Sequence, residues 1–149
     1  MSNGFCARMR AAFLALQLLL ITQPLLAEDP RPDAPDTLAG ATKVDAEGVI
    51  NTMGELENLI VIDARVAMDR KQGYIEGSIS LPDTDTDCET LSVIVPALNH
   101  PVLFYCNGPK CGRSVKSIIK AQKCGYTKLY WFRGGFEEWT KKNYPILKE

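Results

Sequence analysis

The sequence contains a single histidine, His100, and this scarcity excludes several kinds of catalytic site. His100 stands six residues before Cys106, with an apolar run between them. If that run is a strand, a rise of about 3.3 Å per residue places the two backbones about 20 Å apart. A general base must lie within hydrogen-bond reach of the group that it deprotonates. A cysteine–histidine protease or acyltransferase is therefore disfavoured.

The chain also lacks an excess of charge of one sign and any two cysteines in a Cys-x-x-Cys spacing. A net charge of -1 gives no basic footprint for nucleic acid. Without that spacing, neither a zinc site nor a thioredoxin-type motif is supported, and we expect no metal and no cofactor. An EF-hand loop starting at Asp83 would need Gly at Cys88 and Glu at Ile94. We expect a solvated acidic loop there, in which an exposed Cys88 could pair with the thiol of a partner.

Long apolar runs are missing except near the N-terminus, where residues 11–21 are almost wholly apolar. Arg8 and Arg10 precede this run, and Ala27 follows it at a suitable cleavage position. The pattern predicts a secretory signal peptide over residues 1–27, with an apolar part too short for a comfortable membrane span. We therefore expect a periplasmic protein without a stable membrane span after cleavage. An uncleaved N-terminal anchor is the alternative.

Cleavage after Ala27 leaves 15 basic and 18 acidic residues and four cysteines. The remaining residues, 28–149, are enough for one domain with one core, and nothing in their sequence requires more than a monomer. The four cysteines could form two disulfides in an exported domain, but the apolar content can build a core without them. We interpret the four cysteines primarily as reactive groups and only secondarily as structural disulfides. The mature cysteines are Cys88, Cys106, Cys111 and Cys124.

Proline-rich residues 28–43 predict a flexible leader, and residues 44–149 then alternate between helical and strand patterns. Asp45 is a suitable N-cap for a short helix with Val49, Ile50 and Met53 on one side. Continuous apolar runs indicate strands buried on both faces of a parallel sheet. We expect strands at 59–62, 102–105 and 129–132, with a weaker one at 78–81. Helical spacing follows Ser114 up to Gly125, and a last helix contains Phe136 and Trp139; residues 91–98 are ambiguous.

Cys106 ends one of these strands and opens a loop rich in Gly and cations that runs directly into a helix. Loop amides and a helix N-terminus both favour negative charge on the sulfur. Lys110 and Arg113 add positive charge, which makes the cysteine a better nucleophile. The order of strand, cysteine, loop and helix therefore predicts a reactive thiolate made by dipoles and cations alone. The loop residues singled out are Asn107, Gly108, Lys110, Cys111, Gly112, Arg113 and Ser114, the last of which could simply cap the helix that follows.

Four separated segments together resemble a single-domain rhodanese-like sulfurtransferase of the exported bacterial type. The segments are Val61–Arg65, Gly73–Ile79, Tyr105–Cys106 with Gly112–Ser114, and Arg133–Gly135 with Trp139. The resemblance implies a three-layer α/β/α fold with a mainly parallel sheet of about five strands. The sequence departs from the family pattern in two places. Tyr74 stands where His is usual, and six residues instead of four separate Cys106 from Arg113.

The resemblance implies that the Cys106 thiolate takes a sulfane sulfur from an anion such as thiosulfate and becomes a persulfide. A thiol, cyanide or a protein thiol would then accept the outer sulfur. Lys110 and Arg113 would contact the anion, and Arg133 could help from the rim. The Asp63 and Arg65 pair would pin neighbouring loops. Trp131 and Trp139 are most simply core residues.

Two further functions stay open on the sequence alone. A phosphatase-like or arsenate-reducing thiolate would want five residues between Cys and Arg, whereas this loop has six. A non-catalytic redox or docking module would instead use a reversible Cys106–Cys111 disulfide. Cys111 could also resolve an oxidised or persulfidated Cys106, or merely line the loop.

Overall fold

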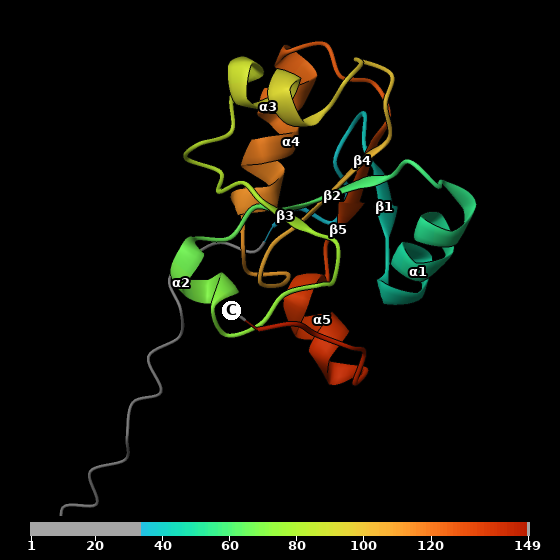
Figure 1. Ribbon diagram of the computed structural model, residues 1–149, viewed down its shortest axis with the longest axis vertical. Helices are drawn as coiled ribbons and strands as arrows, with labels where there is room; N and C mark the ends of the chain where they lie inside the picture. Colours follow the sequence, from blue (N-terminus) through green and yellow to red (C-terminus); the bar gives the residue numbers. More distant parts are fainter. Residues whose placement is uncertain (1–33, 149) are drawn as a thin grey trace, which may run out of the picture.

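The computed structural model describes residues 34–148, which form one parallel five-stranded sheet with helices on both faces (Figure 1). The strand order is β1-β5-β4-β2-β3, and every pairing is parallel. The strands are β1 Thr42–Val44, β2 Ile60–Asp63, β3 Ile79–Ser80, β4 Val102–Tyr105 and β5 Leu129–Phe132. The helices are α1 Ala46–Glu55, α2 Ala67–Arg70, α3 Cys88–Ile94, α4 Arg113–Lys123 and α5 Gly135–Lys141.

The central strand β4 supplies both layers of the core, since successive side chains of a strand point to opposite faces. Val102 and Phe104 pack in one cluster with residues of α3 and α4. Leu103 and Tyr105 pack in a second cluster with residues of α1 and α5. Figure 1 shows α3 and α4 side by side, away from α1 and α5. The predicted three-layer α/β/α class is thereby confirmed.

Most of the predicted elements are present at or near their predicted residues. The predicted strands at 102–105 and 129–132 coincide with β4 and β5, and residues 59–62 lie within one residue of β2. The Asp45 side chain accepts a hydrogen bond from the backbone N–H of Gly48 and caps α1, as predicted. Val49 is buried, as predicted, but Ile50 and Met53 are exposed. Only one of the three residues predicted for the apolar side of this helix is therefore buried. Trp131 and Trp139 are core residues, as predicted.

The predicted flexible leader is wrong for its described part, residues 34–43. Thr42–Val44 form the edge strand β1 beside β5, and Ala34 is buried in the first core cluster. The Gln122 side chain donates a hydrogen bond to the backbone carbonyl of Ala39. These contacts hold the segment on the domain. The predicted signal peptide, residues 1–27, and residues 28–33 lie outside the described residues.

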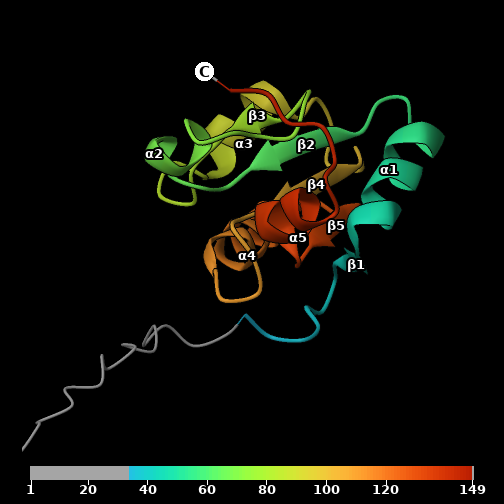
Figure 2. The same cartoon turned by 90° about the horizontal axis from the view of Figure 1, so that it is seen from below.

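The ambiguous stretch at 91–98 resolves into the end of α3, which stops before Pro96. Asp87 caps this helix in a reciprocal pair of hydrogen bonds with Thr90. The C-terminal segment returns to the stretch between α2 and β3, where Leu147 forms an isolated antiparallel bridge with Tyr74 (Figure 2). His100 lies before β4 and its Nε2 contacts the carbonyl oxygen of Asn58 at 2.6 Å. It is thus at the end of the strand opposite Cys106, as predicted.

Cys88 and Cys124 form a disulfide with a Cα–Cα distance of 5.4 Å. Cys88 is exposed, as predicted, but its partner is Cys124 of the same chain. Cys124 packs half-buried against the first core cluster. This disulfide is a structural link between α3 and α4. The interpretation of the cysteines as reactive groups therefore applies only to Cys106 and Cys111.

Candidate active site

The predicted site residues follow three neighbouring strands at one edge of the sheet. Asp63 ends β2, Cys106 follows β4, and Arg133 follows β5. Ligand sites of parallel sheets lie outside the carboxyl ends of the strands. The fold therefore brings residues from separate parts of the sequence to one edge.

Asp63 is completely buried and holds together a cluster of cations and hydroxyls. Arg65 donates two hydrogen bonds to its carboxylate, from Nε at 2.9 Å and from Nη2 at 2.7 Å. Arg70 Nη1 and the Tyr105 hydroxyl donate to Asp63 Oδ2 at 3.2 and 2.8 Å. Arg65 also donates to the carbonyl oxygen of Gly73, and Arg70 to that of Ser78. The cluster thus fastens the segment after β2 to the approach to β3.

Burial and the Asp63 carboxylate shift the pKa values of Arg65 and Tyr105 in this cluster. Burial alone would lower the pKa of Arg65, but the hydrogen bond and the charge of Asp63 raise it. Burial and the Asp63 charge raise the pKa of Tyr105 well above its ordinary value. Arg65 and Tyr105 therefore keep their protons at neutral pH. The contacts of Asp63 and Arg65 hold neighbouring segments together, which is a structural role. Arg70 was missed by sequence reasoning, since nothing in its local pattern marks it as a second cation on Asp63.

Tyr74, which replaces the usual His, packs against this same cluster. The guanidinium carbon of Arg70 lies 3.7 Å from the centre of its ring. Such stacking is a favourable cation–π contact. The departure from the family pattern at this position affects packing around the buried cluster.

The backbone after β4 is fastened to the start of α5. The N–H groups of Phe136 and Glu137 donate to the carbonyl oxygens of Cys106 and Asn107 at 2.9 and 2.7 Å. Gly135 allows this approach: its φ is +58°, and an added Cβ would collide with the carbonyl oxygen of Cys106. Because a planar peptide points its N–H opposite to its C=O, the amides of Asn107 and Gly108 point away from α5.

The loop then folds back on itself through a turn, in which the N–H of Cys111 donates to the carbonyl oxygen of Gly108 at 2.9 Å. Among the described residues, the N–H groups of Gly108, Lys110 and Gly112 have no hydrogen-bond acceptor. Gly108 is itself buried. Backbone amides without acceptors beside a strand end form a typical cradle for an anion.

Cys106 and Cys111 lie face to face in this loop and form the second disulfide, with a Cα–Cα distance of 6.2 Å. Their exposed fractions are only 2% and 6%. The sequence left a disulfide, a resolving thiol and a mere lining residue open for Cys111. The structure brings the two sulfurs into direct contact.

The charged side chains around the loop are partly neutralised by carboxylates that sequence reasoning did not single out. Arg113 Nη1 lies 3.4 Å from Asp69, and its Nε lies 3.5 Å from Asp83. The Asn107 side chain donates to Asp69 at 2.8 Å. Lys110 is exposed and makes no ion pair within residues 34–148. Arg113 is thus held between two carboxylates, while Lys110 is available to an incoming anion.

Two expectations for this region need correction. The stretch beginning at Asp83 is not entirely solvated, because Asp83 is buried and contacts Arg113 and Lys116. Ser114 does not cap α4, whose N-cap is Gly112 without a side-chain hydrogen bond. The Ser114 hydroxyl accepts instead from the indole N–H of Trp131 at 3.1 Å, which fixes the first turn of α4 to the sheet.

Arg133 does reach the rim of the loop, but the N-terminal segment occupies it. Its Nε and Nη2 donate to the carbonyl oxygens of Pro35 and Ala34, and Nη2 also pairs with Asp36. The N–H of Ala34 in turn donates to the carbonyl oxygen of Pro109 in the loop. Residues 34–36 therefore tie Arg133 to the loop that follows Cys106.

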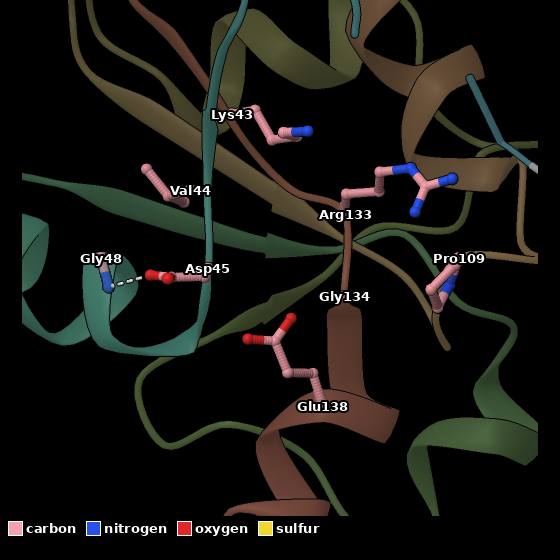
Figure 3. A pocket seen from close by; sticks show the side chains of 8 residues that line it. All are labelled: Lys43, Val44, Asp45, Gly48, Pro109, Arg133, Gly134 and Glu138. Atoms are coloured by element: carbon pink, nitrogen blue, oxygen red, sulfur yellow. Dashed lines mark hydrogen bonds between the residues drawn. The ribbon is translucent and has the colours of Figure 1, made fainter. Parts of the chain in front are cut away.

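A cavity of about 510 Å³ opens beside this tie, between the loop and the start of α1 (Figure 3). Pro109 and the cations Lys43 and Arg133 form part of its wall, whereas Cys106 does not line it. The two carboxylates on its wall are engaged by backbone amides: Asp45 caps α1, and Glu138 accepts from the N–H of Ala46. Both cations are engaged as well: Lys43 Nζ donates to the carbonyl oxygen of Asp36 at 2.8 Å, and Arg133 pairs with the Asp36 carboxylate.

No helix within residues 34–148 has the length and hydrophobicity needed to span a bilayer. Within the same residues, no three metal-ligating side chains come together in the way a metal site requires.

Comparison with known proteins matches residues 45–142 to the model of the rhodanese-like domain. The uncharacterized protein YibN of Escherichia coli (strain K12) is 23% identical over 113 residues, which cover 75% of this chain and 77% of that protein. The BH2092 protein from Bacillus halodurans has a TM-score of 0.63 at 27% identity, covering 72% of this chain and 77% of its own. Thiosulfate sulfurtransferase from Pseudomonas aeruginosa has a TM-score of 0.58 at 21% identity, covering 72% of this chain and 20% of its own.

Proposed function

Because the chain belongs to the rhodanese-like family, we propose that it is a sulfurtransferase that carries sulfur as a persulfide on Cys106. The donor is a small anion with a sulfane sulfur, such as thiosulfate, and the acceptor is a thiol, cyanide or a protein thiol. The observation that carries the proposal is the position of Cys106 at a strand end, in a loop where the amides of Gly108, Lys110 and Gly112 have no acceptor among the described residues. The protein acts as a monomer in this proposal.

The loop supports the chemistry by stabilising negative charge where it develops. The thiolate attacks the outer sulfur of thiosulfate, the sulfur–sulfur bond breaks, and sulfite leaves with the electron pair. The persulfide that remains is anionic, and preorganised amides stabilise such charge without reorganising during the step. The acceptor then attacks the outer sulfur, and Cys106 leaves as a thiolate again.

The surrounding cations support an anionic donor. Lys110 is exposed at the loop and makes no ion pair within residues 34–148, whereas Lys43 and Arg133 beside Pro109 are held by residues 34–36. A thiosulfate sulfurtransferase and a rhodanese with anions from E. coli are among the similar structures, the latter at 26% identity and a TM-score of 0.52. Their chemistry is consistent with an anionic sulfur donor for this chain.

The test is thiocyanate formation from thiosulfate and cyanide by the reduced protein. We expect Cys106→Ser to lower the rate by about a thousandfold or more, as is usual when a covalent nucleophile is removed. The control is Cys88→Ser/Cys124→Ser, which removes the other cysteine pair and should leave the rate within about twofold of wild type. Full activity in folded Cys106→Ser would refute the assignment.

A second candidate is a non-catalytic redox or docking module, and the Cys106–Cys111 disulfide is the observation that favours it. In this role the disulfide is reduced and re-formed as the redox state changes. The loop thereby changes its conformation, and a partner protein recognises one of the two conformations. Mass analysis of the isolated protein under mild reductant separates the two. A Cys106–Cys111 disulfide that persists there would count against persulfide turnover.

We also propose that the protein is exported to the periplasm after cleavage at Ala27. The signal-like pattern of residues 1–27 supports export, and two disulfides suit an oxidising compartment. N-terminal sequencing of the protein from its natural source should begin at Glu28. An intact Met1 would contradict cleavage.

A further inference from the structure

Cys111 is the nucleophilic side chain that the structure brings closest to the Cys106 sulfur. The turn from Gly108 to Cys111 folds the loop so that the two Cα atoms are 6.2 Å apart, and the sulfurs meet directly. Neither cysteine is more than 6% exposed. A persulfide formed on Cys106 would therefore lie against Cys111 inside the loop.

The surroundings of Cys111 favour its reactive form. Cys111 directly precedes Gly112, the N-cap of the eleven-residue helix α4. The partial positive charge of a helix N-terminus stabilises a thiolate, and the adjacent Lys110 adds a full charge. Lys110 has no carboxylate partner among the described residues, so its charge is not cancelled locally. Cys111 therefore lies next to Cys106 and is also placed to act as a nucleophile toward it.

We propose that Cys111 resolves the Cys106 persulfide and releases its outer sulfur as hydrosulfide. The Cys111 thiolate attacks Cys106 Sγ and forms the Cys106–Cys111 bond. The bond between Cys106 Sγ and the outer sulfur breaks, and the outer sulfur leaves with the electron pair and takes up the proton that the Cys111 thiol gave up, as hydrosulfide. This inference rests on the proposed function, because it needs the persulfide as its starting point.

The complete turnover balances without any further oxidant. Thiosulfate and the reduced cysteine pair become sulfite, hydrosulfide and the Cys106–Cys111 disulfide. The two protein sulfurs are oxidised, and the sulfane sulfur is reduced. A dithiol, either a dithiol protein or dithiothreitol in the assay, then reduces the disulfide and restores the starting state. The protein would therefore act as a dithiol-dependent thiosulfate reductase in addition to a sulfurtransferase.

Intramolecular attack has a clear advantage over an external thiol at this site. Groups held in reacting geometry behave as though present at concentrations far beyond those of a free reagent. An external thiol must first diffuse to the loop, whereas Cys111 already lies against Cys106. Cyanide is small enough to compete for the outer sulfur, so the products depend on the acceptor supplied.

The test is a single turnover of reduced protein with one equivalent of thiosulfate, after removal of the reductant. In the chain that begins at Glu28, and so lacks Cys6, the Cys88→Ser/Cys124→Ser background leaves one cysteine pair. Wild type with disulfide mapping repeats the test in the native chain. Sulfite reports persulfide formation, hydrosulfide reports resolution, and intact mass reports the state of the protein. The matched variants in this background are Cys111→Ser and Cys106→Ser.

We expect the background protein to release one equivalent each of sulfite and hydrosulfide and to lose two hydrogens in forming the disulfide. Cys111→Ser should stop after sulfite and retain one added sulfur, and Cys106→Ser should release neither product. Sulfite without hydrosulfide, with the sulfur retained on the background protein, would overturn the role of Cys111 and leave the sulfurtransferase intact. Equal hydrosulfide from Cys111→Ser would overturn that role as well. Absence of sulfite from every protein would overturn the proposed function itself.

Discussion

The two cysteine pairs of this domain have the same covalent bond and very different surroundings. Cys88 and Cys124 are 36 residues apart and join α3 to the C-terminal end of α4 near the surface. Cys106 and Cys111 are 5 residues apart and lie buried just before the N-terminal end of α4. The eleven residues of α4, about 16 Å at 1.5 Å per residue, separate the pairs. One helix thus has a different kind of cysteine pair at each end.

Loop length and surroundings together separate a structural pair from a chemical one. A crosslink stabilises mainly by restricting the unfolded chain, which gives about 4 kcal/mol for the longer loop and about 2 kcal/mol for the shorter. The short loop therefore gains less stability from its bond. It has instead the features that a reactive sulfur needs: amides without acceptors, a nearby cation and a helix start.

The largest effect on stability is expected from the surface pair. Cys88→Ser/Cys124→Ser should lower the free energy of unfolding of the oxidised protein by about 4 kcal/mol, because the unfolded chain is no longer closed into a loop between residues 36 positions apart. Urea denaturation measures this change. Cys106→Ser/Cys111→Ser should cost clearly less. An equal loss from both double variants would erase the distinction between the pairs.

A smaller loss of stability, joined to a loss of activity, is expected at the contact between α5 and the loop. Gly135→Ala places a Cβ against the Cys106 carbonyl at a φ of +58°, and the loop must shift. We expect about 2 kcal/mol of destabilisation and at least a tenfold lower rate of sulfur transfer. Gly54→Ala is the matched control, since an added Cβ meets nothing within 4 Å there. A Gly135→Ala protein as active as the control would show that the backbone position of Cys106 is not critical.

The smallest effect tests whether charge at the start of α4 assists the chemistry. Lys110 and Lys116 are both exposed, but only Lys110 lies in the loop that follows Cys106 and makes no ion pair within residues 34–148. Lys110→Gln should raise the KM for thiosulfate by about threefold, equivalent to about 0.6 kcal/mol of anion binding. Lys116→Gln, at a side chain that is 70% exposed, should change it by less than about twofold. Similar changes in both variants would assign the effect to general surface charge.

The sequence predicted those parts of the fold that depend on local pattern. Apolar runs located β4 and β5, and the capping preference of Asp45 located α1. The edge strand β1 was missed because its pairing with β5 is a long-range contact of a proline-rich segment. The Cys88–Cys124 link was missed for a similar reason, since its partners lie in separate helices and no local signal joins them.

The candidate site shows the same limit. The order of strand, cysteine, loop and helix is local, and it predicted where Cys106 stands relative to the sheet and to α4. The carboxylates that hold Arg113 come from α2 and from the segment after β3, so their positions depend on the tertiary fold. The hydrogen bonds from Arg133 to residues 34–36 could not be predicted either. Their acceptors are backbone carbonyls, which every residue has and which therefore leave no sequence pattern.

The most direct test of the account is to locate the sulfur that thiosulfate delivers. Reduced Cys111→Ser protein, incubated with thiosulfate and alkylated, would be digested and its cysteine peptides weighed. The account predicts one added sulfur on the peptide that contains Cys106 and none on the peptides with Cys88 or Cys124. A protein that gains no sulfur, or gains it on another cysteine, would contradict the assignment of Cys106 as the sulfur carrier.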